Sequence, residues 1–302
     1  MGKDNQRKRS TRQVIAFFAA LLAIALCVEM ALRALNPVGR LPVFPHNDYE
    51  ITLALHGSTE FDRIFYGSSP VVAAFRGADT ASGYTEFGLV FGKITYLLTL
   101  LEEGHITVRE DIVLGLNVAL FMDTLDTDPR YPWHQGTFEP YVYFHRNRLN
   151  TFFQSNLSRF LEGDFYLERH ENLEKWLYFG VLPDEALDNL AEAHMARFGD
   201  LTLADFVENL AALERLIAFC EANDIRLRAV WMPVNPDIDD RPQPEVFAQA
   251  NALAHTILTD RGIEVKDMTH AFPREYFYDF GHMNFEVGAV AFTKEIDLWL
   301  NP

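Results

Sequence analysis

The sequence predicts an α/β domain built on a doubly wound parallel sheet and preceded by one N-terminal transmembrane helix. Two patterns predict this: short apolar runs alternate with helix-length amphipathic segments, and an uncharged stretch directly follows a basic N-terminus. Hydrophobic residues make up 49% of the 302 residues and aromatic residues 13%, which excludes a disordered chain. A chain of this length holds one large domain or two small ones.

The N-terminus is typical of a signal anchor. Residues 1–13 carry a local charge of +4, and the uncharged stretch VIAFFAALLAIALCV follows over 14–28. A span needs about 20 mostly apolar residues, which 14–35 provide if Glu29 and Arg33 lie at the far interface. The basic flank then stays cytoplasmic and the body lies outside. A cleaved signal peptide and a buried helix of a soluble protein are the alternatives.

The charge excludes one broad class of function. The chain carries −17 overall, so the body after the basic flank carries −21, and a pI near 4.9 argues against a general nucleic-acid binder. With only Cys27 and Cys220, neither a disulfide scaffold nor a four-cysteine zinc site is possible.

The body begins after a linker, which we expect over residues 36–58 because this stretch holds three prolines and no sustained period. The domain proper then covers 59–302. Its predicted strands are short apolar runs, the first of them ending at a glycine, and its predicted helices show apolar residues at i, i+3, i+4 and i+7 or end at a glycine. The strands are 61–67, 82–88, 111–117, 226–234 and 263–268, and the helices are 93–104, 205–225, 245–262 and 285–300.

An insertion interrupts this alternation at residues 121–204. It holds an aromatic stretch over 130–148 and helical pieces near 150–161 and 183–198. We expect it to lie over the active face of the sheet and not to form a separate domain.

Three polar stretches are candidates for the active site, because active groups gather at the carboxyl ends of parallel strands. Two of them follow predicted strands, and the third precedes the last predicted helix. Gly67-Ser68-Ser69-Pro70 follows the first strand, where a serine at a tight turn presents its hydroxyl. Asn117 follows the strand 111–117 and offers an amide donor to an oxyanion. Asp279 lies three residues before His282, a spacing that lets the carboxylate orient an imidazole base. Taken singly, each stretch is also explained by a turn or a helix cap.

Together, the order and surroundings of these stretches resemble the SGNH/GDSL hydrolase superfamily. The segment TEFGLVFGKITYLLTLLEEG (85–104) resembles the second sequence block of that superfamily. RAVWMPVNP (228–236), KDMT (266–269) and YFYDFGHMNFEVGAVAFT (276–293) resemble its membrane-anchored extracytoplasmic branch. That branch includes the D-alanyl-lipoteichoic acid protein of the Dlt system and exopolysaccharide acetylation proteins.

The resemblance implies a flavodoxin-like three-layer sandwich and a role for each residue. Ser69 is the implied nucleophile, His282 the base and Asp279 the carboxylate that orients it. The implied oxyanion hole combines the Ser69 backbone N–H, the Gly88 N–H and the Asn117 amide. No cofactor is implied.

The resemblance covers roughly 60–120 and 205–301, and the chain departs from the pattern at three positions. Ser68 replaces the usual Asp, Glu86 stands where an Asn often precedes the second-block glycine, and Val118 replaces the Asp after the Asn. These departures bear most on the oxyanion assignments.

Other polar residues have competing interpretations. Trp133, His145 and Arg146 in the aromatic stretch are candidates for contacting a sugar or anionic substrate, with a structural cover as the alternative. Asp267 and His270 repeat the Asp-x-x-His spacing, so a four-ligand metal site with the later pair is a weaker alternative.

The expected function is a membrane-anchored extracytoplasmic serine esterase or O-acyltransferase. It acts on acyl groups, expected to be acetyl, of a cell-envelope or secreted glycan and has no nucleic-acid partner. The alternative is a non-catalytic assembly protein that holds a membrane-bound acyltransferase, and the departures at Glu86 and Val118 motivate it.

Overall fold

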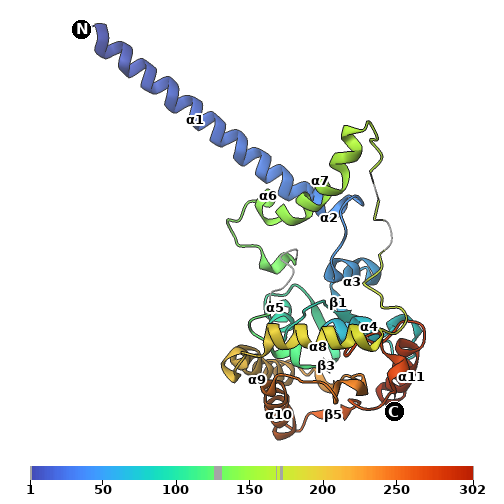
Figure 1. Cartoon of the computed structure of the whole chain (residues 1–302). Coiled ribbons are helices and arrows are strands. Elements are labelled where there is room, and N and C mark those ends of the chain that lie inside the picture. The colour runs from blue at the N-terminus through green and yellow to red at the C-terminus, as the bar shows by residue number, and fades with distance from the viewer. Residues whose placement is uncertain (1, 126–130, 168, 171–172, 302) are drawn as a thin grey trace. The chain divides into compact units, whose positions relative to one another are not determined.

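The computed structural model describes residues 2–125, 131–167, 169–170 and 173–301, with the backbone alone for residues 2–12 (Figure 1). The chain forms two compact units. Residues 1–46 and 129–172 form the first, here called the anchor unit, and residues 47–128 and 173–302 form the second, the sheet unit. The basic side chains expected in the cytoplasmic flank and the first residue of the aromatic stretch, Arg130, lie outside the described residues.

The sheet unit contains five parallel strands in the order β2-β1-β3-β4-β5. The predicted α/β class with a doubly wound parallel sheet is thereby confirmed. The chain order reverses between β1 and β3, and ligands of doubly wound sheets bind at such a switch point. The strands are β1 (Glu60–Gly67), β2 (Thr85–Gly88), β3 (Thr107–Leu116), β4 (Arg226–Trp231) and β5 (Glu264–Asp267).

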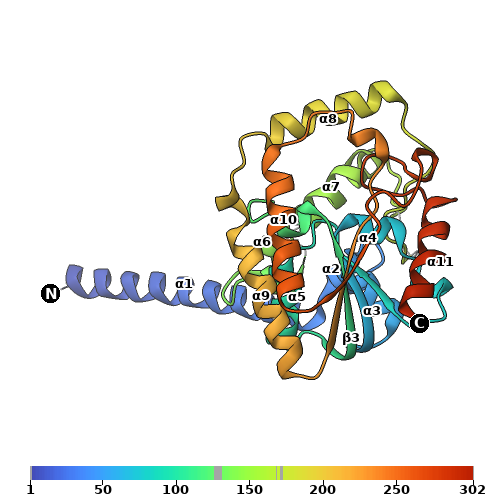
Figure 2. The same cartoon turned by 90° about the horizontal axis from the view of Figure 1, so that it is seen from below.

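Helices cover both faces of this sheet, as Figure 2 shows. One face carries α4 and α11, and the other carries α5, α9 and α10, while α3 packs against the edge strand β2. The helices are α3 (Asp48–His56), α4 (Ser69–Ala74), α5 (Ile94–Glu102), α8 (Asp184–Phe198), α9 (Val207–Ala222), α10 (Glu245–Asp260) and α11 (Gly288–Leu300).

Two glycines let α4 approach the sheet closely. Gly67 ends β1 and pairs with Gly115 of β3. A Cβ atom on Gly67 would lie 2.4 Å from Cγ2 of Val71, and one on Gly115 would lie 2.2 Å from the same methyl group. Any larger residue would therefore push α4 away, and with it the turn that carries Ser68 and Ser69.

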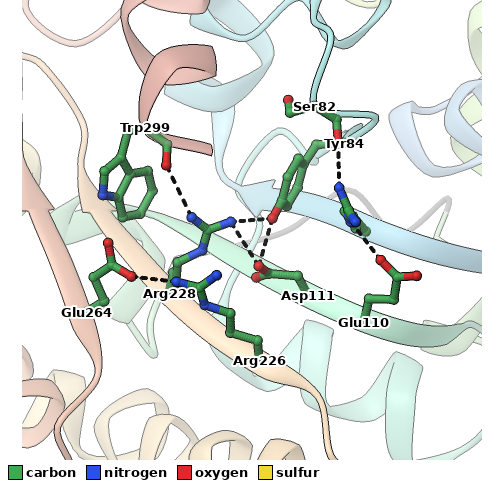
Figure 3. Close-up of polar contacts among 9 residues, drawn as sticks. Ser82, Tyr84, Glu110, Asp111, Arg226, Arg228, Glu264 and Trp299 are labelled. Atoms are coloured by element: carbon green, nitrogen blue, oxygen red, sulfur yellow. Dashed lines mark hydrogen bonds and ion pairs between the residues drawn. The ribbon is translucent and has the colours of Figure 1, made fainter. Parts of the chain in front are cut away.

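A buried ion pair ties the sheet to the C-terminal helix (Figure 3). Arg228 of β4 donates to the Asp111 carboxylate of β3 at 2.8 Å and to the Tyr84 hydroxyl, and its guanidinium lies 4.7 Å from the Trp299 ring centroid. Arg228 is 1% exposed and Asp111 5%. Because both charges are withdrawn from water, each depends on the other for its hydrogen bonds.

The anchor unit consists of a long apolar helix and the helices that pack at its C-terminal end. It contains α1 (Gly2–Leu35), α2 (Pro37–Arg40), α6 (Tyr141–Phe144) and α7 (Arg146–Leu161). Residues 13–40 are long and apolar enough to cross a membrane, and none of their most apolar window is buried in protein. The structure therefore does not show the buried helix of a soluble protein.

The structure adds detail to two segments of the expected organisation. Residues 36–58, expected to form a linker, contain α2 and α3. The start of α3 is marked in the sequence by a capping box. The side chain of Asn47 accepts from the N–H of Glu50, and the side chain of Glu50 accepts from the N–H of Asn47. Within the expected insertion 121–204, residues 129–172 belong to the anchor unit, and residues 121–128 and 173–204 belong to the sheet unit.

Candidate active site

The Gly-Ser-Ser turn lies at the switch point of the sheet, directly after β1. Ser68 is buried and precedes α4, and Ser69 begins the helix with Pro70 behind it. Proline suits the first turn of a helix because the N–H it lacks would have no partner there. The Ser69 backbone N–H therefore belongs to the free N-terminal end of α4, next to its own hydroxyl group.

The structure brings Ser69, His282 and Asp279 into one hydrogen-bonded row. Nε2 of His282 lies 2.8 Å from Oγ of Ser69, and Nδ1 of His282 lies 2.7 Å from Oδ2 of Asp279. Residues 213 positions apart in the chain thus meet at hydrogen-bond distance. A hydroxyl, an imidazole and a carboxylate in this order can activate the hydroxyl as a nucleophile.

The tight turn from Asp279 to His282 holds the carboxylate in place. Oδ1 of Asp279 accepts the backbone N–H groups of Gly281 at 2.9 Å and His282 at 2.8 Å. Burial opposes ionisation of Asp279, but the hydrogen bonds from His282 and these N–H groups outweigh it, so the pKa of Asp279 lies below its usual value. An ionised Asp279 accepts from Nδ1–H, which leaves Nε2 free to accept the Ser69 hydroxyl proton.

Asn235 supports the same turn from the loop that follows β4. It is fully buried, its amide donates to the backbone oxygen of Asp279 at 3.2 Å, and its N–H donates to that of Phe280 at 2.9 Å. Sequence reasoning found the segment that contains Asn235 but gave the residue no role.

Tyr178 is a contact of the site that sequence reasoning missed. Its ring stacks on the His282 imidazole with centroids 4.3 Å apart and planes 12° apart. Its backbone oxygen accepts the N–H of Phe285 at 2.7 Å, which ties the segment around residue 178 to the loop that carries the imidazole. Burial raises the pKa of the Tyr178 phenol, so the ring is neutral. The residue lies in the predicted insertion, where no motif distinguishes it.

Asn117 reaches the Gly-Ser-Ser turn, but its amide donates to Ser68. The distance from Nδ2 of Asn117 to Oγ of Ser68 is 2.6 Å. Its side-chain oxygen accepts the N–H of Leu120 at 3.0 Å, which fixes the orientation of the amide. The residue thus lies beside the predicted nucleophile with its N–H₂ group directed at the turn.

Gly88, the third predicted oxyanion donor, has its N–H engaged. The N–H donates to Oε1 of Glu86 at 2.5 Å, and Oε2 of Glu86 pairs with Nζ of Lys175 at 2.6 Å. Lys175 also donates to the Gly88 backbone oxygen at 2.9 Å. Burial raises the pKa of Glu86, and the ion pair with Lys175 offsets part of this rise. Because position 86 is Glu where the family pattern often has Asn, a carboxylate accepts the backbone N–H that was predicted to stabilise the oxyanion.

A cavity of about 610 Å³ lies beside this pair. Glu86 and Lys175 contribute to its wall, together with Arg76, Phe285 and residues of α3 and α4. Ser69 and His282 are not among its lining residues.

The remaining predicted residues contact their own neighbours. Trp133 stacks on Tyr131 with centroids 4.9 Å apart, His145 is buried, and the Arg146 guanidinium lies 4.1 Å from the Tyr143 ring centroid. All belong to the anchor unit, and their role as substrate contacts stays a prediction.

The alternative metal site gains no support from the geometry. Oδ1 of Asp267 accepts from both the N–H and the hydroxyl of Thr269 and so closes its own turn. Within the part of the chain that the structure describes, no three or more His, Cys, Asp or Glu residues gather closely enough to hold a metal ion.

Comparison with known proteins adds little to this geometry. No protein-family model matches the chain, and no curated protein matches it. Among solved structures, the chain is similar to an acetyl xylan esterase with 10% identity and a TM-score of 0.38, over 78% of this chain and 98% of that one. A likeness at that TM-score carries no weight for the activity, so the function is inferred without it.

Proposed function

We propose that this protein is a membrane-anchored, extracytoplasmic serine esterase or O-acyltransferase of the SGNH type. The observation that carries the proposal is the row of hydrogen bonds from Ser69 through His282 to Asp279. Three side chains from two distant loops meet in the order that acyl transfer through a serine needs, at the end of the sheet where active groups collect.

In the proposed acylation step, Oγ of Ser69 attacks the carbonyl carbon of an ester while its proton passes to Nε2 of His282. The ionised Asp279 stabilises the imidazolium that forms. The tetrahedral oxyanion then collapses, the C–O bond to the leaving alcohol breaks, and the imidazolium returns its proton to that alcohol. An acyl-Ser69 ester remains.

The oxyanion is stabilised in this proposal by the Ser69 backbone N–H and the Asn117 amide, both beside the nucleophile. The Gly88 N–H joins them only when the Glu86 carboxylate leaves it. Water or a sugar hydroxyl then attacks the acyl-Ser69 carbonyl and gives its proton to Nε2 of His282. The bond between the acyl carbon and Oγ of Ser69 breaks, the imidazolium returns the proton to Oγ, and the free acid or the new sugar ester leaves.

The location and the substrate class rest on two further observations. The apolar helix over residues 13–40, with a basic flank before it, supports a single-pass anchor with the N-terminus inside. The sequence resemblance to extracytoplasmic glycan-modifying proteins favours an acyl group, expected to be acetyl, on a cell-envelope or secreted glycan.

Hydrolysis of p-nitrophenyl acetate by the detergent-solubilised full chain tests the nucleophile. Ser69→Ala is expected to lower kcat/KM by at least about 10³-fold, because loss of a nucleophile removes the covalent route. The neighbouring Ser68→Ala serves as the matched control and is expected to lose less than about 10-fold, the effect of one hydrogen bond. Equal rates for wild type and Ser69→Ala would reject Ser69 as the nucleophile.

One observation favours the second candidate, a non-catalytic assembly protein that binds a membrane acyltransferase. The Glu86 carboxylate occupies the Gly88 N–H, and the Lys175 ion pair holds it there. In this alternative the site binds a partner or an acyl group without turnover. A fluorophosphonate probe separates the two, since the assembly protein would show no labelling that depends on Ser69.

A further inference from the structure

We propose that an exposed apolar surface of the anchor unit lies on the lipid bilayer as a second membrane contact. We call it the α7 surface: Tyr143, Phe153, Leu157, Leu161, Phe165 and Tyr166, each more than half exposed. The proposal rests on the membrane anchor proposed above and adds to it a lipid-bound face outside the spanning helix.

The pattern along α7 defines this surface. Phe153, Leu157 and Leu161 stand at i, i+4 and i+8, so they form one apolar stripe along the helix. A different side of α7, with Arg148 and Asn156, is buried against the rest of the unit. The stripe is thus additional to the packing face. Soluble proteins rarely leave contiguous apolar surface of this kind in water.

The surface is fixed to the end of α1. The backbone N–H of Tyr141 donates to Glu29 at 2.7 Å, and Arg33 donates to the backbone oxygen of Glu139. Leu32 of α1 and Phe152 of α7 pack against a small core of Val38, Phe44 and Tyr141. The last turns of α1 therefore hold α6 and the start of α7 where the chain leaves the proposed span.

The direction of α7 suits a helix in the membrane plane. In Figure 1, α7 runs across the direction of α1 and not along it. If α1 crosses the bilayer, α7 then follows its surface, with the apolar stripe available to the acyl chains. Aromatic residues such as Tyr143 and Tyr166 are the residues that favour the headgroup region.

The charge distribution favours lipid as the occupant. Residues 14–46 and 129–172 carry a formal charge of only +1, whereas residues 47–128 and 173–302 carry −22. Anionic headgroups therefore repel the sheet unit but not the α7 surface. A partner membrane protein could cover the same apolar face. Purified protein in lipid vesicles distinguishes the two, because no partner protein is present there.

The test uses the full chain in vesicles of phosphatidylcholine and phosphatidylglycerol, with Cys27→Ser and Cys220→Ala as the background. A single Leu157→Cys carries an NBD fluorophore, and Ser155→Cys, an exposed polar position on the same helix, is the matched control. Thermal unfolding of each labelled chain checks that it is folded.

We expect NBD at position 157 to show blue-shifted emission and several-fold quenching by doxyl-labelled lipid, and NBD at position 155 to be quenched by aqueous iodide. If both positions are equally open to iodide in vesicles, the lipid contact is rejected and a protein partner takes its place. If the chain does not float with the vesicles at all, the anchor itself fails. The Ser69-dependent esterase assay is independent of both outcomes.

Discussion

Replacing Asp279 by Asn tests the hydrogen-bonded row most sharply, because the change keeps the size of the side chain and reverses its hydrogen bonding. The carboxylate accepts three hydrogen bonds, from the two backbone N–H groups of Gly281 and His282 and from Nδ1 of the imidazole. In the Asp279→Asn variant the remaining side-chain oxygen still serves the backbone groups. The amide N–H₂ then faces Nδ1, so Nδ1 becomes an acceptor and the ring proton moves to Nε2.

With its proton on Nε2, His282 donates toward Ser69 and no longer accepts the hydroxyl proton. The expected loss in kcat/KM is about 10⁴-fold, the size of a wrong-tautomer effect in a serine hydrolase, which equals about 5.5 kcal/mol of transition-state stabilisation. Hydrolysis of p-nitrophenyl acetate at neutral pH measures it.

Asp267→Asn is the matched control, since Asp267 also lies three residues before a histidine and also accepts hydrogen bonds within its own turn. It is expected to leave kcat/KM unchanged. The reasoning fails if Asp279→Asn keeps wild-type activity, or if both variants lose activity to the same extent.

Three further changes test other parts of the structure. Tyr178→Ala is expected to lower kcat about 3- to 30-fold through the loss of a ring stack on His282, about 0.5–2 kcal/mol, whereas Tyr178→Phe keeps the stack and the rate. A fall in KM alone would contradict this. Arg228→Met leaves the Asp111 charge buried and unpaired and is expected to cost about 3–5 kcal/mol in thermal unfolding, while the double variant with Asp111→Leu recovers most of that loss. An additive double variant would refute the pairing. For Asp297, burial raises the pKa but the N–H groups it accepts outweigh this, so the pKa lies below the usual value and its contribution is present at neutral pH. Asp297→Asn is therefore expected to lower Tm at pH 7 but not at a pH low enough to protonate Asp297 in the folded protein, and a difference in Tm independent of pH would contradict it.

Regular alternation made the sheet predictable, and local hydrogen bonds explain where the strand ends were wrong. The second strand was expected from residue 82, but β2 begins at Thr85 because Ala81 and Ser82 donate to Asp297 and not to a neighbouring strand. β3 begins at Thr107, earlier than expected, since its first half is charged and lies at the exposed end of the sheet.

The candidate site was predictable where a motif lies on consecutive residues and not where distant segments meet. The Gly-Ser-Ser turn and the Asp-x-x-His step are such motifs, and the structure brings them together. Tyr178 and Lys175 reach the site from a segment without any motif, so only the folded arrangement reveals their contacts. The ion pair that holds the Glu86 carboxylate in place also comes from Lys175, which is 89 positions away in the chain.

Trapping the acyl-enzyme tests the central claim most directly. The full chain is mixed with p-nitrophenyl acetate, quenched with acid and digested, and its peptides are analysed by mass spectrometry. We predict an acetyl group on Ser69 that is absent from Ser69→Ala and strongly reduced in His282→Ala, because the imidazole activates the hydroxyl. An unmodified Ser69 peptide during measurable turnover, or labelling that persists unchanged in Ser69→Ala, would contradict the proposed mechanism.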